Sequence, residues 1–286
     1  MPASAEARIG GRTRLVGVIG WPVQHSLSPA IHNAAFAASG LDWIYVPLPV
    51  PPDRLQPALA GLVALGFAGA NVTMPHKTEA AELIERVSED ASLLRAVNAI
   101  EVVGDVLEGH NTDVGGFDRF LRRDAGFDPA GRSALLYGAG GASRACALAL
   151  ARAGIAHLTV VARNEATTGG LRMIAATLGV PLETVGTADA AGRRFDLVVN
   201  ATPVGGEAQP EHRSHPALDP DVLVVDLLYD PPTTELQRRA REAGATVFGG
   251  VGLLVEQAAL AFELWTGTPA PLEVMSAAAL AGLADP

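Results

Sequence analysis

The heptapeptide Asn71-Val72-Thr73-Met74-Pro75-His76-Lys77 indicates how this chain folds. It follows the apolar run at 67–70 and precedes a helical pattern at 78–86. A strand end, a turn and a helix start are therefore expected within these residues. In α/β proteins, loops of this kind carry the ligand-binding and catalytic side chains.

Two polar side chains and one lysine of the heptapeptide are expected to share a space. Asn71 and Thr73 are two positions apart, so in an extended strand their side chains leave from the same face. Pro75 has no amide hydrogen and disfavours the helical region at Met74, so the chain must turn there. The turn would bring Lys77 toward Asn71 and Thr73. For this segment alone, a capped helix start with a solvated lysine is the simpler alternative.

Alternating strand and helix patterns around the heptapeptide predict an α/β fold. Strands are expected at 15–20, 43–50 and 67–73, and helices at 28–40, 52–65 and 78–86. This order predicts a mostly parallel sheet with helices on both faces. Because 98–103 and 106–109 are both strand-like, a hairpin about Gly104-Asp105 should follow.

The loop after the first strand ends in a helix-start signal. Ser28 is expected at the N-cap and Pro29 at the first helical position. Ser26 and Ser28 would then lie at the positive end of the helix dipole, where unpaired amides bind a carboxylate or phosphate. Plain capping by Ser28, with no ligand at Ser26, is equally compatible with this segment.

A second α/β pattern follows the polar segment 123–132, which contains Gly and Pro and which we interpret as a boundary region. A strand at 133–137, a glycine-rich turn at 138–143, a helix at 144–153 and a strand at 157–162 come in that order. Glycines at such a turn let backbone amides meet a pyrophosphate at the helix N-terminus. Ser143 stands where the general dinucleotide-binding fingerprint has its third glycine.

The residues after 157–162 lie where such folds distinguish NAD from NADP. An acidic side chain there favours a free ribose 2′-hydroxyl, and an arginine favours a 2′-phosphate. Arg163 comes first and Glu165 follows two residues later, so spacing alone leaves both cofactors open. The loops at 201–206 and 228–232 also follow strands and are candidate parts of a cleft.

Two further polar residues have a structural and a functional interpretation. Asp113 precedes a helical pattern at 115–123, where most aspartates are simple N-caps. Gln257 shares a face with Leu253 on a mainly apolar helix at 252–267. It is either a satisfied core group or a ligand contact.

Composition excludes several classes of protein. The 286 residues are 49% apolar and 18% charged, as in a globular protein of one large or two medium domains. A net charge of −10 argues against nucleic acid or an anionic membrane as the main partner. From the sequence we expect no membrane span and no signal peptide, and the single cysteine, Cys146, fits a reducing cytoplasm. Because no Cys/His cluster has ligand spacing, we expect no metal.

Eight segments, taken together, resemble the shikimate dehydrogenase family. They are SLSPAIHN (26–33), NVTMPHK (71–77), AVNAI (96–100), HNTDVGG (110–116), GAGGASRA (138–145), NATPVG (200–205), VVDLLYDPPTTEL (224–236) and GGVGLLVEQAALAFELWTG (249–267). They occur in the family's order, and the resemblance extends over nearly the whole chain. One such motif would be weak, whereas eight in order are highly specific.

The resemblance implies two domains and a reaction. Residues 1–112 with 250–286 would form a substrate-binding domain, and 113–249 a Rossmann-like NAD(P)-binding domain. The implied reaction is the reversible, NADPH-dependent reduction of 3-dehydroshikimate to shikimate, on the route to chorismate and the aromatic amino acids. The partner would be this small molecule rather than nucleic acid or membrane, and the enzyme a cytoplasmic monomer or homodimer.

The family's functional residues carry over position by position. Lys77 and Asp113 would be the catalytic pair. Substrate contacts would come from Ser26, Ser28, Asn71, Thr73, Asn98, Tyr229 and Gln257. Cofactor contacts would come from Gly138, Ala139, Gly140, Gly141, Ala142, Arg163, Asn164, Thr202, Leu227, Gly250 and Leu253.

The chemistry of a ketone reduction explains the catalytic pair. Hydride addition leaves a negative charge on the ketone oxygen, which a proton must neutralise. Lys77 can exchange that proton. Asp113 would hold the ammonium and the substrate hydroxyl through charge-assisted hydrogen bonds. Because a carboxylate also stabilises the charged amine, we expect Lys77 to orient and stabilise as well as to carry the proton.

The chain departs from the family's pattern at the cofactor end. The usual Asn-Arg-Thr signature, with a second arginine three residues later, is here Ala162-Arg163-Asn164 followed by Thr167. Arg163 favours NADP, while Glu165 keeps NAD possible. Leu253 replaces a common methionine, a swap that conserves volume.

Two alternatives to shikimate reduction stay open. A quinate or aminoshikimate dehydrogenase would share the Lys/Asp pair and differ in the ring substituents it accepts, although Ser26 with Thr73 favours shikimate. A catalytically silent dinucleotide-binding regulator could use the same fold, but loss of Lys77 or Asp113 would be its sign, and both are present.

Overall fold

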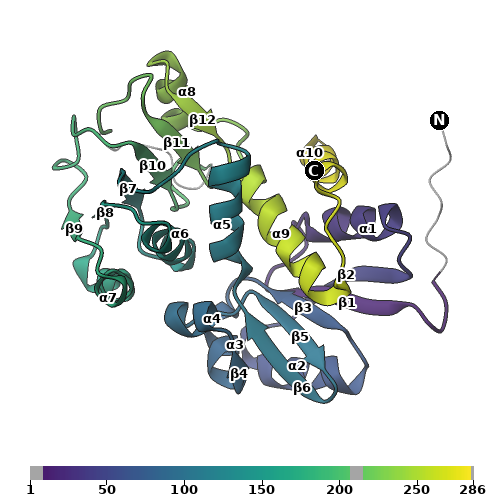
Figure 1. Cartoon of the computed structure of the whole chain (residues 1–286). Coiled ribbons are helices and arrows are strands. Elements are labelled where there is room, and N and C mark those ends of the chain that lie inside the picture. Colours follow the sequence, from purple (N-terminus) through teal and green to yellow (C-terminus); the bar gives the residue numbers. More distant parts are fainter. Residues whose placement is uncertain (1–8, 207–214, 285–286) are drawn as a thin grey trace, which may run out of the picture. The chain divides into compact units, whose positions relative to one another are not determined.

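The computed structural model describes residues 9–206 and 215–284 (Figure 1). They form two compact units, and α9 (Val251–Thr266) contributes to both. Unit 1 contains the described residues up to Thr112 and from Val255 onward. Unit 2 runs from Asp113 to Leu254.

The sheet of unit 1 has the order β2-β1-β3-β5-β6-β4. Its strands are β1 (Arg14–Gly20), β2 (Trp43–Pro49), β3 (Gly69–Val72), β4 (Arg86–Val87), β5 (Ala99–Val103) and β6 (Val106–His110). β1 pairs in parallel with β2 and β3, with Val16 opposite both Tyr45 and Gly69. The predicted hairpin is present as β5 and β6, and β5 runs antiparallel to β3. The sheet is therefore mixed, and the expected parallel arrangement is limited to β1, β2, β3 and the β4–β6 pair.

The helices of unit 1 bury the sheet's apolar residues. They are α1 (Ser28–Ala38), the short η1 (Pro52–Arg54), α2 (Leu55–Ala64), α3 (Lys77–Leu83), α4 (Glu89–Leu94), most of α9 and α10 (Leu272–Ala284). Ile19, Leu59 and Val72 belong to one buried cluster between strands and helices. At the end of α9, the indole of Trp265 donates a 2.9 Å hydrogen bond to the carbonyl of Ile100. This bond fastens α9 to the sheet of unit 1.

Unit 2 contains a parallel sheet in the order β12-β11-β10-β7-β8-β9. Its strands are β7 (Ser133–Tyr137), β8 (His157–Val161), β9 (Leu182–Val185), β10 (Leu197–Asn200), β11 (Leu223–Asp226) and β12 (Thr246–Phe248). Its helices are α5 (Thr112–Arg123), α6 (Gly141–Arg152), η2 (Glu165–Thr168), α7 (Gly169–Leu178) and α8 (Glu235–Glu242). This is the strand order of dinucleotide-binding folds, and it reverses direction between β7 and β10.

Several boundaries differ from the sequence-based expectations. α3 ends at Leu83 instead of residue 86, because Ile84 is extended and Arg86–Val87 pairs with β6. α6 begins at Gly141, inside the expected turn. The segment 123–132 is not a boundary, since it lies within unit 2. The expectations for 163–196 and 233–243 did not include α7, β9 or α8.

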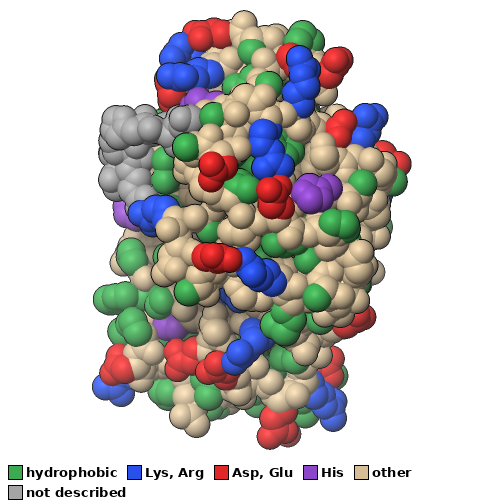
Figure 2. Space-filling model, turned by 90° about the vertical axis from the view of Figure 1, so that its left-hand side faces the viewer, with side chains coloured by type: hydrophobic (Ala, Val, Ile, Leu, Met, Phe, Trp, Pro, Cys, Tyr) green, Lys and Arg blue, Asp and Glu red, His purple; other side chains and the backbone are tan. Residues whose placement is uncertain are grey.

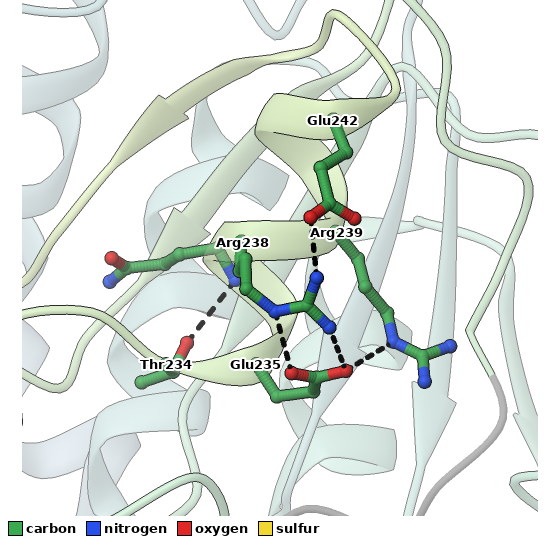
Figure 3. A network of polar contacts seen from close by, with 6 residues as sticks. Thr234, Glu235, Arg238, Arg239 and Glu242 are labelled. Atoms are coloured by element: carbon green, nitrogen blue, oxygen red, sulfur yellow. Dashed lines mark hydrogen bonds and ion pairs between the residues drawn. The ribbon is translucent and has the colours of Figure 1, made fainter.

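α8 is a surface helix held by its own charges. Glu235 accepts hydrogen bonds from Arg238 and Arg239, and Arg238 also pairs with Glu242 (Figure 3). Thr234 caps the helix by accepting from the amide of Gln237 at 3.2 Å. On the face shown in Figure 2, acidic and basic side chains are interspersed and hydrophobic ones lie in small scattered groups. Among the described residues, no helix combines the length and apolar character needed to cross a membrane.

Candidate active site

In unit 1, the loops after β1 and β3 lie side by side. The amide of Trp21 donates to the carbonyl of Met74 at 3.0 Å, and the amide of Thr73 donates to that of Ile19 at 2.8 Å. β1 lies between β2 and β3, so the sheet order reverses at β1. Ligands of α/β sheets bind at the carboxyl ends of strands where such a reversal occurs. The loops with the two serines and with the heptapeptide meet at that position.

The start of α1 differs from the expectation. Ser28 is not the N-cap: it is the first helical residue, and Leu27 precedes it without a side-chain cap. Ser26 instead accepts a 3.3 Å hydrogen bond from the amide of Ser28. Ser26 therefore accepts a hydrogen bond from a helix amide that has no partner within the helix. The Ser28 hydroxyl interacts with Tyr45 on β2.

A chain of buried polar groups links the strands behind these loops. The hydroxyl of Tyr45 donates to Oδ1 of Asn71 at 2.7 Å, and Nδ2 of Asn71 donates to the carbonyl of Asn98 at 3.0 Å. Oδ1 of Asn98 accepts from the amide of Thr112 at 2.7 Å, and its Nδ2 donates to the Thr112 hydroxyl at 3.0 Å. All four residues are buried. Asn71 and Asn98, both predicted site residues, are therefore brought together, and Tyr45 is a member that the sequence analysis missed.

Lys77 follows an anchored histidine. His76 is fully buried, and its Nε2 lies 2.7 Å from the carbonyl of Val50. The amide of His76 donates to the carbonyl of Thr73 at 3.0 Å, and the carbonyl of Lys77 accepts from Val97 at 2.9 Å. Lys77 and Thr73 are themselves half-buried. β3 ends at Val72, so Thr73 belongs to the turn rather than to the strand that was expected to include it.

Asp113 lies in the first turn of α5, directly after the tethered Thr112. It is half-buried and belongs to unit 2. Burial raises the pKa of the Cys146 thiol above its usual value, and the negative charge of Asp113 adds to that effect. Cys146 is therefore an inert thiol within the core of unit 2.

The two remaining candidate substrate ligands come from different units. Tyr229 follows β11 in unit 2 and is half-buried. Burial raises the pKa of its hydroxyl, and the neighbouring Asp230 raises it further, so the group stays a neutral donor. Gln257 lies on the part of α9 that belongs to unit 1, where it is half-buried.

A hollow of about 1020 Å³ opens at the strand ends of unit 2. It lies where β7 and β10 diverge, the position at which this strand order binds dinucleotides. Its lining consists of Tyr137, Gly138, Ala139, Gly140, Val161, Ala162, Arg163, Asn164, Thr167, Thr187, Ala188, Ala201, Thr202, Pro203 and Val204. The predicted cofactor residues from Gly138 to Gly140, with Arg163, Asn164 and Thr202, are thus brought together.

The backbone at the start of α6 fits a pyrophosphate. Gly138 has a φ of +103°, and a Cβ added there would lie 2.8 Å from Cγ2 of Thr202, so the position requires glycine. A Cβ added at Gly140 or Gly141 would meet nothing within 4 Å, which leaves the first amides of the helix open. Ser143, in place of the third glycine, is fully buried and donates a 2.7 Å hydrogen bond to the carbonyl of Gly138. The serine therefore fastens the turn to the helix.

The charges beyond β8 fit an additional phosphate. Arg163 lines the hollow, is exposed, and has no hydrogen-bond or ion-pair partner among the described residues. Glu165 is absent from the lining and pairs with Arg172. Asn164 accepts from the amide of Ala166 at 2.9 Å, which holds the turn between them. The hollow therefore presents an uncommitted cation, while the competing carboxylate is neutralised elsewhere.

The other predicted cofactor contacts lie outside the lining of this hollow. A Cβ at Gly250 would lie 2.1 Å from the carbonyl oxygen of Leu227, so these two residues touch and only glycine fits. Leu253 lies in the first turn of α9, half-buried. Gly141 and Ala142, the first residues of α6, are exposed beside the glycine turn.

Comparison with known proteins gives a consistent match. Residues 18–100 match the model of the shikimate dehydrogenase substrate binding domain, and residues 250–280 match that of the shikimate 5′-dehydrogenase C-terminal domain. Shikimate dehydrogenase (NADP(+)) of Geobacter metallireducens is 44% identical over 287 residues, which cover 96% of this chain and 99% of that protein.

Two solved structures are similar over nearly the whole chain. Shikimate 5-dehydrogenase from Thermus thermophilus, in complex with NADP(H) and shikimate, is 35% identical with a TM-score of 0.83, covering 94% of this chain and 99% of that one. Quinate dehydrogenase from Corynebacterium glutamicum, in complex with NAD, is 31% identical with a TM-score of 0.85 and the same coverage.

Proposed function

The chain belongs to the shikimate dehydrogenase family, and we propose that it catalyses the reversible, NADPH-dependent reduction of 3-dehydroshikimate to shikimate. It is an oxidoreductase of chorismate and aromatic amino acid biosynthesis, with NADP as its cofactor. Unit 1 would bind the substrate, and unit 2 the dinucleotide. The observation that carries this proposal furthest is the buried hydrogen-bonded set in unit 1, which includes Ser28, Asn71 and Asn98.

In this proposal, hydroxyl and amide side chains bind the substrate. Ser26 and Ser28, at the positive end of α1, would bind the substrate carboxylate. Asn71, Thr73 and Asn98 would contact ring hydroxyls from the carboxyl end of β3 and the start of β5. Tyr229 and Gln257 would add contacts from β11 and α9.

Catalysis requires a group that exchanges a proton with the reacting oxygen. Lys77 is the only lysine of the sequence and, apart from seven histidines, the other basic side chains are arginines. A guanidinium stays protonated in proteins, whereas an amine can release and regain a proton. We assign proton exchange at the reacting oxygen to Lys77. Asp113 would hold the ammonium and the hydroxyl in line through charge-assisted hydrogen bonds.

The cofactor would be held by the hollow of unit 2. The nicotinamide supplies or receives the hydride. The open amides at the start of α6 and the glycine turn would bind the pyrophosphate, and Thr202 would border it from β10. Arg163 would pair with the ribose 2′-phosphate, with Asn164 beside it. Leu227, Gly250 and Leu253 would border the nicotinamide.

A substrate and cofactor panel tests the proposal. Purified enzyme is supplied with shikimate, quinate or aminoshikimate and either NADP or NAD, and turnover is followed by nicotinamide absorbance. We expect the highest kcat/KM for shikimate with NADP. A higher kcat/KM with quinate than with shikimate would contradict the proposed substrate. A higher kcat/KM with NAD than with NADP would contradict the proposed cofactor. Cofactor binding without turnover on any of these acids would instead support a silent regulator.

The finer aspects of assembly and location are also proposals. A monomer or homodimer is expected, and light scattering during size-exclusion chromatography measures it. A cytoplasmic location fits the single cysteine, Cys146, which leaves the sequence without an internal disulfide. Fractionation of cells that produce the protein measures it.

A further inference from the structure

Tyr45 is a buried phenol among the candidate substrate ligands of unit 1. It lies on β2, is only 1% exposed, and its hydroxyl is 2.7 Å from Oδ1 of Asn71. The side chain of Ser28 also hydrogen-bonds to it. Neither the sequence analysis nor the proposed chemistry gives this residue a role.

The hydrogen bonds around Asn71 fix which way its amide faces. One terminal atom lies 3.0 Å from the main-chain carbonyl of Asn98, which can only accept a hydrogen bond. That atom must therefore be the nitrogen, and the oxygen must face Tyr45. Tyr45 is then the donor, and burial raises the pKa of its hydroxyl so that it keeps its proton.

This arrangement leaves one N–H of the Asn71 amide for a ligand. Oδ1 already accepts from Tyr45, and one of the two amide hydrogens is donated to Asn98. The remaining N–H can only donate. A ligand group that meets this N–H must therefore be an acceptor, such as a hydroxyl oxygen or a carboxylate.

Tyr45 is itself held on both its backbone and its ring. The Asn33 amide donates to the Tyr45 carbonyl at 2.9 Å, and Oδ1 of Asn33 accepts from the Tyr45 amide at 2.8 Å. The ring of His32 stacks on the phenol with 4.4 Å between centroids and 1° between planes. Trp265 packs near it with 6.1 Å between centroids. The hydroxyl is thus fixed relative to α1 and the end of α9.

We propose that Tyr45 is a positioning residue for substrate binding: its hydroxyl holds the side-chain amide of Asn71 in the orientation that presents an N–H donor to an acceptor oxygen of the substrate. The inference rests on the proposed function and goes beyond it, because it assigns the polarity of one contact. Without the hydroxyl, Oδ1 of Asn71 loses its donor and only the Asn98 carbonyl still holds the amide, so the N–H is aimed less firmly at the acceptor oxygen.

The test is a double-mutant cycle with Tyr45→Phe and Asn71→Ala. Tyr45→Phe keeps the ring and its stacking, so it removes only the hydroxyl. We expect it to raise KM for shikimate about 2- to 10-fold, the range for one neutral hydrogen bond. The values of kcat and of KM for NADP should stay within about twofold, since only substrate binding is affected. In the Asn71→Ala background, adding Tyr45→Phe should not raise KM further.

A matched control removes a buried hydroxyl that positions nothing. Thr159 on β8 is fully buried, and its hydroxyl has no partner among the described residues. Thr159→Val should leave KM for shikimate unchanged. Equal KM effects of Tyr45→Phe with and without Asn71 would overturn the inference, because Tyr45 would then not act through that amide.

A spectroscopic measurement separates this inference from the proposed function. In ¹⁵N-labelled enzyme, the side-chain amide signal of Asn71 is assigned by its absence in Asn71→Ala. Tyr45→Phe should shift or broaden that signal and leave the signal of Asn200, in unit 2, in place. This result would support the positioning role even if wild-type enzyme did not oxidise shikimate, which would count against the function alone. An unmoved Asn71 signal would overturn the inference.

Discussion

The two units present their polar groups to small molecules in different ways. In unit 1, side chains at the strand ends are tied to one another, as Tyr45, Asn71, Asn98 and Thr112 are, before any ligand arrives. In unit 2, the strand ends carry glycine, so that backbone amides and an open hollow form the binding surface. A compact ring with hydroxyls on several sides requires donors and acceptors in fixed places. A pyrophosphate requires only several amides with a common direction.

The polar links of the two units also differ in their charge and their burial. The links in unit 1 are neutral and buried, whereas the ion pairs of α8 in unit 2 are charged and exposed. Exposed ion pairs contribute little to stability, because water screens them and long side chains lose entropy on pairing. The following predictions test this contrast, from the largest expected effect to the smallest.

Replacing Lys77 tests the proposed acid–base group of unit 1. Lys77→Ala should lower kcat about 10²- to 10⁴-fold, the range for a positioned acid–base group. Lys77→Arg keeps the charge but cannot exchange a proton at ordinary pH. A loss in Lys77→Arg as large as in Lys77→Ala therefore indicates proton transfer, and near-normal turnover in Lys77→Arg indicates an orienting charge. Unchanged kcat in Lys77→Ala would remove the residue from the mechanism.

Replacing the first glycine of the turn tests the backbone surface of unit 2. Gly138→Ala should raise KM for NADP at least about tenfold and destabilise the fold by roughly 1–3 kcal/mol, since φ is positive and the new Cβ meets Thr202. KM for shikimate should change little. Gly140→Ala is the control for stability, because its Cβ meets nothing. Equal melting temperatures of the two variants without cofactor would contradict the explanation.

Acid should weaken unit 1 through a buried histidine. Burial lowers the pKa of His32 from 6.5 to about 3, and neither ring nitrogen has a partner among the described residues. Below about pH 6.5 the unfolded chain binds a proton at His32, whereas the folded chain does not bind it until the pH nears 3. The free energy of unfolding therefore falls as the pH falls from about 6.5 toward 3.

His32→Phe should remove this dependence, which amounts to at most about 1.4 kcal/mol per pH unit for one proton. Urea unfolding at several pH values measures it. His25→Gln, at an exposed histidine, is the control and should keep the wild-type slope. Parallel slopes for wild type and His32→Phe would show that His32 does not titrate on unfolding.

The ion pairs of α8 should give the smallest effect. Glu235→Gln removes the carboxylate that Arg238 and Arg239 share, yet both arginines are exposed to water and the carboxylate is partly exposed. We expect a change in melting temperature smaller than that of Gly138→Ala, and one that shrinks as salt is added. Kinetic constants should not move. A large, salt-independent loss would show that this surface network matters as much as the buried one.

Much of the framework follows from local sequence patterns. The strands at 133–137 and 157–162 are located to within one residue, because a short apolar run bounded by turn residues has few other solutions. The hairpin about Gly104 is also correct, since Gly104 has the positive φ of 61° that its turn needs. α8 was not predicted, because its mostly charged sequence has only two apolar residues, Leu236 and Ala240, to mark its buried face.

Local sequence patterns predicted only part of the candidate site. Ser28 was predicted to be the N-cap of α1, but Leu27 occupies that position. Ser26 instead accepts a hydrogen bond from the amide of Ser28. Tyr45 stands in a strand of otherwise apolar residues, and its one signal was that a buried phenol needs a hydrogen-bond partner. No spacing rule could identify Asn71 as that partner, since the two residues are 26 positions apart.

Most of the elements, their order, the glycine turn and the identity of Lys77 could be read from the sequence alone, because each depends on neighbours along the chain. Only the tertiary structure decided which polar atoms meet. It set the orientation of the Asn71 amide through Tyr45 and Asn98, and it turned Glu165 toward Arg172 and away from the hollow. Hydrogen bonds and ion pairs act over a few ångströms of space, so the packing of distant segments determines them.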